Sequence, residues 1–188
     1  MKAAFFFDTF LLKKEESYYG MTLTYDFLKN RYLKYYDSLI VSTRVKDISE
    51  ENGNTDGYIR TNGKNIDVMP IISYKNIPDG ILRKKEIVGE VNKVLANVDV
   101  AIVRMPSMIG NIVCSICEKN DKKYIIEMVA CAWDGYINHH NKYGKIVAPY
   151  MFIETKKHVK KGKKELYVTI EKLERRYPTK GDKISCSD

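Results

Sequence analysis

The segment Tyr124–Gly135, with the sequence YIIEMVACAWDG, constrains the fold of this chain more than any other stretch. Its near-continuous apolar run is typical of a strand covered on both faces: Ile125, Ile126, Met128 and Val129. Such strands belong to mostly parallel sheets with helices on each side, and ligands bind beyond their carboxyl ends. Trp133, the sole tryptophan, and Asp134 follow this strand. The segment therefore predicts a buried strand that leads into a polar, loop-borne site.

Strand and helix patterns alternate along the rest of the chain. Short apolar runs predict further strands at Ala3–Phe7, Leu39–Val45, Val98–Val103 and Leu166–Thr169. Helical spacing of apolar residues predicts helices over Thr24–Tyr36, around Ile87–Leu95 and over Met108–Cys117. We interpret this alternation as an α/β fold, Rossmann-like and doubly wound, with a mostly parallel sheet and helices on both faces. The 188 residues suffice for one core, so we expect one domain over residues 1–188.

The segments between the predicted strands and helices give four further predictions. Thr9–Thr24 is interpreted as a long polar loop, and Asn62-Gly63 predicts a tight β-hairpin. Gly135–Lys145 is interpreted as a loop, and Pro149 suits the first turn of the helix that follows it. The final residues, ISCSD, have the character of a strand cut off at its exit, so we expect more protein beyond them.

The formal net charge of +8 predicts an anionic partner: nucleic acid, an acidic membrane surface or phosphate-bearing substrates. The run Lys156–Lys164, KKHVKKGKK, is either a solvated helix end or a contact for anions. Phe152, Ile153 and Val159 give this helix an apolar side, which favours acidic lipid head groups over nucleic acid. Four cysteines in a chain of this length favour a reducing, cytoplasmic compartment, with any membrane association peripheral.

Several common site motifs are missing or unconvincing. The chain has neither GxGxxG nor GxxxxGK[ST], so it lacks the main support for a dinucleotide or P-loop site, and we expect no cofactor. Cys114 and Cys117 form a CxxC inside a predicted helix, where buried structural thiols are expected. His139 and His140 are adjacent and point in different directions, so we expect no metal site.

The candidate site residues lie where predicted strands end. Trp133 and Asp134 pair an aromatic face with a carboxylate, although Asp134 is also suited to capping a turn. Gly20, after Tyr18 and Tyr19, is either a hinge or a point where backbone N–H groups approach a phosphate. Ser107, in the turn that begins with Arg104, is a plausible helix N-cap.

A family resemblance rests on two segments, YIIEMVACAWDGYINHHNKYGKIVAPYMFIETKKHVKK and ELYVTIEKLERRYPTKGDKISCSD. They resemble bacterial family 4 glycosyltransferases of the capsule and surface-polysaccharide type. The most specific part is YVT, a short helix, RRYP and a terminal IS-x-S, which coincides with the end of the N-terminal domain in that family. By motif, the resemblance is strong from about Tyr124 onward.

The resemblance implies a GT-B architecture, in which this chain is the N-terminal, acceptor-binding half. A nucleotide-sugar donor would bind mainly to a second domain, which normally carries two glutamates separated by seven residues. This chain has no such pair, so the fragment alone is expected to be inactive. The expected reaction is a retaining transfer, usually without a metal, to a lipid-linked saccharide at the cytoplasmic face of the membrane.

The resemblance also suggests residue roles. Gly20 would lie in the loop near the donor phosphates, and Asp134 would be the catalytic or acceptor-binding carboxylate. Tyr19, Arg104, Ser107 and Trp133 would contact the acceptor. Many relatives carry a histidine near Asp134, a place that His139 or His140 would fill only by folding back. The alternative is a non-enzymatic Rossmann-like module that binds an anionic ligand or nucleic acid.

Overall fold

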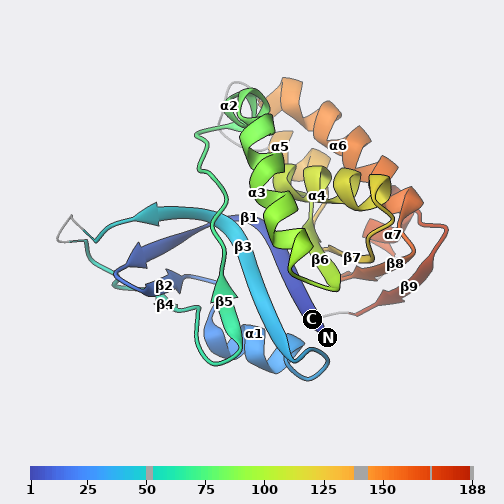
Figure 1. Ribbon diagram of the computed structural model, residues 1–188. Helices are drawn as coiled ribbons and strands as arrows, with labels where there is room; N and C mark the ends of the chain where they lie inside the picture. The colour runs from blue at the N-terminus through green and yellow to red at the C-terminus, as the bar shows by residue number, and fades with distance from the viewer. Residues whose placement is uncertain (50–52, 138–143, 170, 187–188) are drawn as a thin grey trace. The chain divides into compact units, whose positions relative to one another are not determined.

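The computed structural model describes residues 1–49, 53–137, 144–169 and 171–186 (Figure 1). Two compact units divide the chain, Met1–Asp99 and Val100–Asp188. Each unit combines parallel strands with helices, which confirms the expected α/β, Rossmann-like class with a mostly parallel sheet.

The first unit contains three parallel strands extended by an antiparallel pair. The strand order is β4-β2-β1-β3-β5, in which β1–β3 and β3–β5 are parallel while β1–β2 and β2–β4 are antiparallel. The strands are β1 (Lys2–Lys14), β2 (Ser17–Gly20), β3 (Ser38–Asp47), β4 (Ile59–Arg60) and β5 (Ile66–Val68).

β1 is longer than its sequence predicts, and the expected loop Thr9–Thr24 is wrong. The strand continues through Asp8 to Lys14 and turns back into β2, with a register shift against β3 between Phe6 and Phe10. Asp8 is tolerated because Arg44 lies 2.8 Å from it and the Tyr74 hydroxyl donates to it. A partly buried carboxylate with both partners does not end a strand.

The hairpin expected at Asn62-Gly63 is also wrong. β4 and β5 pair with different neighbours, β2 and β3. A tight turn does occur, but it runs from Gly63 to Ile66, whose backbone groups exchange hydrogen bonds of 2.9 and 3.0 Å. Asn65 takes the left-handed conformation there, with φ of 64°.

The helices of the first unit are α1 (Tyr25–Tyr32), α2 (Ile77–Leu82) and α3 (Lys84–Ala96). Of these, α3 agrees with the apolar periodicity, the helix expected over Thr24–Tyr36 ends at Tyr32, and α2 was not expected. The Thr24 side chain accepts from the Phe27 N–H at 3.2 Å, as an N-cap should. The apolar stripe of α3 is buried as its spacing predicts: Ile87, Val91, Val94 and Leu95.

The second unit is a four-stranded parallel sheet in the order β6-β7-β8-β9. Its strands are β6 (Val100–Met105), β7 (Tyr124–Met128), β8 (Lys164–Tyr167) and β9 (Asp182–Ser185). Its helices are α4 (Met108–Lys119), α5 (Ala132–Ile137), α6 (Gly144–Lys161) and α7 (Lys172–Arg176).

Two expectations in this unit are corrected. Trp133 and Asp134 lie in α5 and not in a loop, and α6 begins at Gly144, so Pro149 lies inside it. Proline disfavours a helix interior, yet one face of α6 is buried along its length, at Ala148, Met151, Thr155 and Val159. Tertiary burial of that face therefore outweighs the local preference of Pro149.

Cys114 and Cys117 are buried structural thiols, as expected. Burial raises the pKa of Cys114 well above its ordinary value and that of Cys117 to about 12. Neither thiol is activated for redox chemistry.

Candidate functional site

The candidate site lies at the carboxyl edge of the parallel sheet in the second unit. Because β6, β7 and β8 run parallel, the segments that follow them emerge at one edge. Those segments are the turn Met105–Ser107, the start of α5, and the chain that leads into α7. They bring Trp133 and Asp134 beside the RRYP segment.

Asp134 is held by Arg176. One guanidinium nitrogen, Nη1, donates to both carboxylate oxygens at 2.8 Å, and also to the Cys131 sulfur at 2.9 Å. Lys172 Nζ lies 3.9 Å from the same carboxylate. The hydrogen bond from Arg176 lowers the pKa of Asp134 below its ordinary value. Asp134 is therefore a charged hydrogen-bond acceptor with a fixed orientation.

Trp133, which directly precedes Asp134 in α5, offers a partly open aromatic surface. Its side chain packs edge-on against Phe152 of α6, with ring centroids 6.3 Å apart. The residue keeps 38% of its surface exposed. A Trp133 side chain that packs on Phe152 and stays partly exposed could contact the flat face of a ligand.

Tyr177 fixes the start of α5. Its fully buried hydroxyl accepts from the Ala132 N–H at 2.8 Å, and its backbone carbonyl accepts from the Tyr167 hydroxyl at 2.6 Å. Tyr177 also packs on Phe152, at 5.3 Å between centroids. The RRYP segment thus binds both Asp134, through Arg176, and the helix that carries it. RRYP carries part of the family resemblance, but the sequence did not predict that Arg176 contacts Asp134 or that Tyr177 contacts the start of α5.

Arg104 and Ser107 already have structural partners. Arg104 Nε lies 3.4 Å from Glu127 Oε2, on the adjacent strand at the same register position. Ser107 is 1% exposed and caps α4 by accepting from the Gly110 N–H at 2.8 Å, which confirms its expected capping role. A Cβ at Gly110 would lie 2.6 Å from the Ser107 hydroxyl, so this turn requires a glycine. Acceptor contacts by Arg104 and Ser107 stay predictions.

Tyr19 and Gly20 belong to the first unit, and the predicted setting of Gly20 is corrected. Both lie on β2 and pair with β4, so Gly20 is not in a loop. Gly20 is buried, and a Cβ there would lie 2.8 Å from Leu11 Cδ2. Close packing accounts for this glycine.

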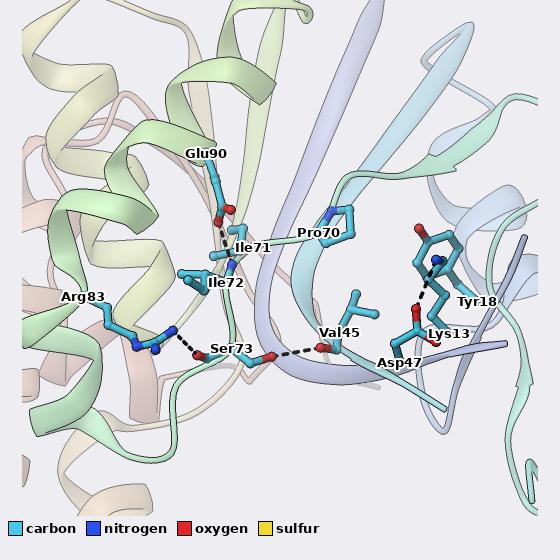
Figure 2. Close-up of a pocket in the computed structure, with 10 residues that line it drawn as sticks. All are labelled: Lys13, Tyr18, Val45, Asp47, Pro70, Ile71, Ile72, Ser73, Arg83 and Glu90. Carbon is cyan, nitrogen blue, oxygen red and sulfur yellow. Dashed lines mark hydrogen bonds and ion pairs between the residues drawn. The ribbon is translucent and has the colours of Figure 1, made fainter. Parts of the chain in front are cut away.

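A shallow depression of about 470 Å³ lies in the first unit, at the carboxyl ends of β1 and β3 (Figure 2). Lys13 Nζ lies 3.1 Å from Asp47, and Arg83 donates to the Ser73 carbonyl at 3.3 Å. Hydrogen bonds from Ser49 and Lys13 lower the pKa of Asp47 to about 2. Ten residues line it: Lys13, Tyr18, Val45, Asp47, Pro70, Ile71, Ile72, Ser73, Arg83 and Glu90. Its mixed donors and acceptors suit a ligand rich in hydroxyl groups.

His139 and His140 lie outside the described residues. Within the described ranges, no group of three or more His, Cys, Asp or Glu side chains is placed to hold a metal ion. No described helix has the length and apolar character needed to cross a bilayer.

The fold and site define a class: a Rossmann-like α/β chain with a polar and aromatic site at the carboxyl edge of parallel strands. No protein-family model matches it. The chain is 31% identical over 181 residues to Protein CapJ of Staphylococcus aureus. That similarity covers 96% of this chain and 45% of CapJ, so the chain spans less than half the length of this relative.

Two solved structures share part of the arrangement. A UGT transferase from Siraitia grosvenorii in complex with UDP is 11% identical, with a TM-score of 0.46, over 94% of this chain and 47% of that one. A Listeria monocytogenes protein described as a UDP-N-acetylglucosamine 2-epimerase is 12% identical, with a TM-score of 0.47, over 93% and 40%. The α/β, Rossmann-like class follows from the parallel strands and their order in the two units.

Proposed function

We propose that this chain is the acceptor-side domain of a glycosyltransferase, which transfers a sugar from a nucleotide-sugar to a lipid-linked saccharide or polysaccharide. The observation that carries the proposal is the 38% exposed Trp133, followed directly in α5 by Asp134, whose carboxylate Arg176 Nη1 contacts at 2.8 Å. A sugar ring presents both a flat apolar surface and hydroxyl donors. This pair of side chains matches both properties at the edge where α/β sheets bind ligands.

Two further observations support the same assignment. The residues most specific to the family resemblance, RRYP, contact the candidate site directly through Arg176 and Tyr177. The similarity to Protein CapJ extends over 96% of the chain and supports a capsular glycosyltransferase-like domain.

In this proposal, Asp134 binds and orients an acceptor hydroxyl. A carboxylate whose pKa is lowered by a guanidinium is a weak base at neutral pH, so the geometry favours orientation over proton removal. Trp133 supplies the platform for the sugar ring. The depression beside Tyr18 and Asp47 is a second saccharide contact, in keeping with its mixed polar lining.

The donor side of the reaction rests on the family resemblance. The nucleotide-sugar would bind mainly to a second domain, and the transfer would retain the anomeric configuration. This chain alone would not turn over, and the protein would work at the cytoplasmic face of the membrane. Donor contact through Gly20 has no support from its buried position on β2.

Trp133, as the sole tryptophan, provides a direct test. We expect oligosaccharides released from the surface polysaccharide of the source cells to change the tryptophan fluorescence of the native protein in a saturable way. Asp134→Asn should weaken this binding at least ~10-fold, because it removes a charged hydrogen-bond acceptor.

Glu171→Gln is the matched control, since Glu171 is an exposed carboxylate paired only with Arg175 across the same helix. It should leave the titration unchanged. Equal affinities for the wild-type protein and Asp134→Asn would remove Asp134 from the acceptor site. A fluorescence response to nucleic acid, and none to saccharide, would favour the binding-module alternative.

A further inference from the structure

The outward side of α6 carries an apolar stripe. Ile146, Tyr150 and Ile153 follow one another at spacings of four and three residues, so they lie on one side of the helix. They are 75%, 47% and 62% exposed. The opposite side of α6 is buried, and Figure 1 shows the helix alongside α4 and α5. Large apolar side chains gathered on one exposed surface mark an interaction site.

Lysines continue the same side toward the end of the helix. Lys157 and Lys160 are exposed there, and Lys156, also exposed, lies at the margin of this side, with its Nζ 5.6 Å from the centroid of the Phe152 ring. Lys157 is paired only loosely, with its Nζ 3.6 Å from the Glu154 carboxylate. We call these six residues the α6 outer face: Ile146, Tyr150, Ile153, Lys156, Lys157 and Lys160.

This face differs from the one that the sequence suggested. Val159 is fully buried, and Phe152 packs between Trp133 and Tyr177, so neither is free to meet a partner. Only Ile153 of the expected apolar side is exposed. The exposed stripe instead includes Ile146 and Tyr150, which helical spacing alone did not distinguish from buried positions.

We propose that the α6 outer face binds the anionic surface of a lipid bilayer, with the helix lying in the plane of the interface. Isoleucine and tyrosine side chains enter the boundary between head groups and acyl chains, while lysines meet the anionic head groups. The combination of both side-chain types on one helix face fits a charged lipid surface better than it fits nucleic acid, which offers no apolar layer. This inference deepens the proposed function, because a lipid-linked acceptor is presented at such a surface.

The test is co-sedimentation of the native protein with vesicles of phosphatidylcholine alone or with 30% phosphatidylglycerol, a composition of about one anionic lipid in three chosen to give a negative surface potential. We expect binding to the anionic vesicles only, weakened by salt. Replacing Ile146, Tyr150 and Ile153 together by Ser should reduce partitioning at least ~10-fold. Replacing Lys156, Lys157 and Lys160 together by Gln should reduce it on the order of 100-fold.

Each triple variant has a matched control elsewhere on the chain. Ser at Tyr35, Ile59 and Leu82 removes one tyrosine and two aliphatic side chains of similar exposure. Gln at Lys84, Lys85 and Lys93 removes three exposed lysines from α3. Both controls should bind vesicles as the wild-type protein does.

The proposal would be overturned by equal binding to neutral and anionic vesicles, by no binding to either, or by α6 variants that bind normally. It would also be overturned if the serine variant dissociated a dimer, or destabilised the native protein, in place of losing lipid binding. Either result would make the face a protein interface. Vesicle binding is measured without sugar transfer, so a protein that includes the proposed donor-binding domain and binds vesicles but transfers no sugar contradicts only the proposed function. A protein that transfers sugar but ignores vesicles contradicts only this inference.

Discussion

The pKa of Asp134 lies below its ordinary value because a single Arg176 nitrogen lies 2.8 Å from both of its oxygens. If this contact lowers the pKa of Asp134, removing Arg176 should change the titration of the Asp134 carboxylate. In Arg176→Gln, we expect the pKa of Asp134 to rise toward its ordinary value of 3.8, moderated by Lys172. Carboxyl-detected NMR across the acid range measures this directly.

Arg175→Gln serves as the control for that experiment. Arg175 pairs with Glu171 on the exposed side of the same short helix, so its loss should leave Asp134 unaffected. An Asp134 titration that does not move in Arg176→Gln would mean that the observed ion pair is not formed in solution.

At the scale of elements, α4 and α6 are joined by a buried histidine. His158 is 1% exposed, and its Nδ1 lies 2.6 Å from Glu118 Oε1, while Lys161 lies 3.0 Å from Glu118 Oε2. Burial alone would raise the pKa of Glu118, but the hydrogen bonds from His158 and Lys161 lower it below 4.5. The ionised carboxylate therefore helps to hold the two helices together.

This arrangement predicts a dependence of stability on pH. Because the folded-state pKa of Glu118 is lowered, its contribution is present above the unfolded value and is lost as pH falls through the folded value. Glu118→Gln should destabilise the protein at pH 7 by about 1 kcal/mol and lose less stability than the wild type on acidification. Urea unfolding at pH 7 and in steps below pH ~4.5 measures both effects.

The matched control is Asp121→Asn, because Asp121 and Lys163 form a fully exposed pair near the same helix end. We expect it to change the free energy of unfolding by less than about 0.5 kcal/mol at either pH. An acid transition in Glu118→Gln identical to that of the wild type would rule out Glu118 as the titrating group.

The elements also show what the sequence can and cannot predict. Strands such as β7 and helices such as α3 and α4 were predictable because apolar periodicity and capping residues are local signals. The full length of β1 was not, because Asp8 is neutralised by Arg44, far along the chain. The start of α6 was predicted wrongly from Pro149 for a similar reason. Burial of one face of α6 stabilises the helix on both sides of this proline.

The candidate site was predictable to the same degree. The position of Trp133 and Asp134 just beyond β7 was predictable because the buried strand is a local apolar signal, while their role in binding stays a prediction. Their contacts with Arg176 and Phe152 come from elements well separated in sequence, and no local pattern reveals such pairing. Gly20 was predicted to lie in a ligand-binding loop because, in sequence, a glycine required by close packing resembles one required by a ligand.

At the scale of the whole molecule, the chain spans 45% of the length of Protein CapJ, and the proposed function assigns the donor mainly to a second domain. In that setting, Trp133 should contribute to acceptor binding through the 38% of its surface that is exposed, besides packing on Phe152. The central claim is thus that the carboxyl edge of the parallel sheet in the second unit binds the sugar acceptor.

The most direct measurement is transfer of labelled sugar from nucleotide-sugars to a lipid extract of the source cells, by the native protein that joins this chain to the proposed donor-binding domain and by its Trp133→Ala variant. We predict transfer by the wild-type protein, and a loss of about 10-fold in Trp133→Ala at limiting acceptor, as expected for one aromatic contact. Leu82→Ala, which removes a side chain that is 84% exposed in the first unit, should transfer normally. Absence of transfer from every nucleotide-sugar, or full activity of Trp133→Ala, would contradict the account.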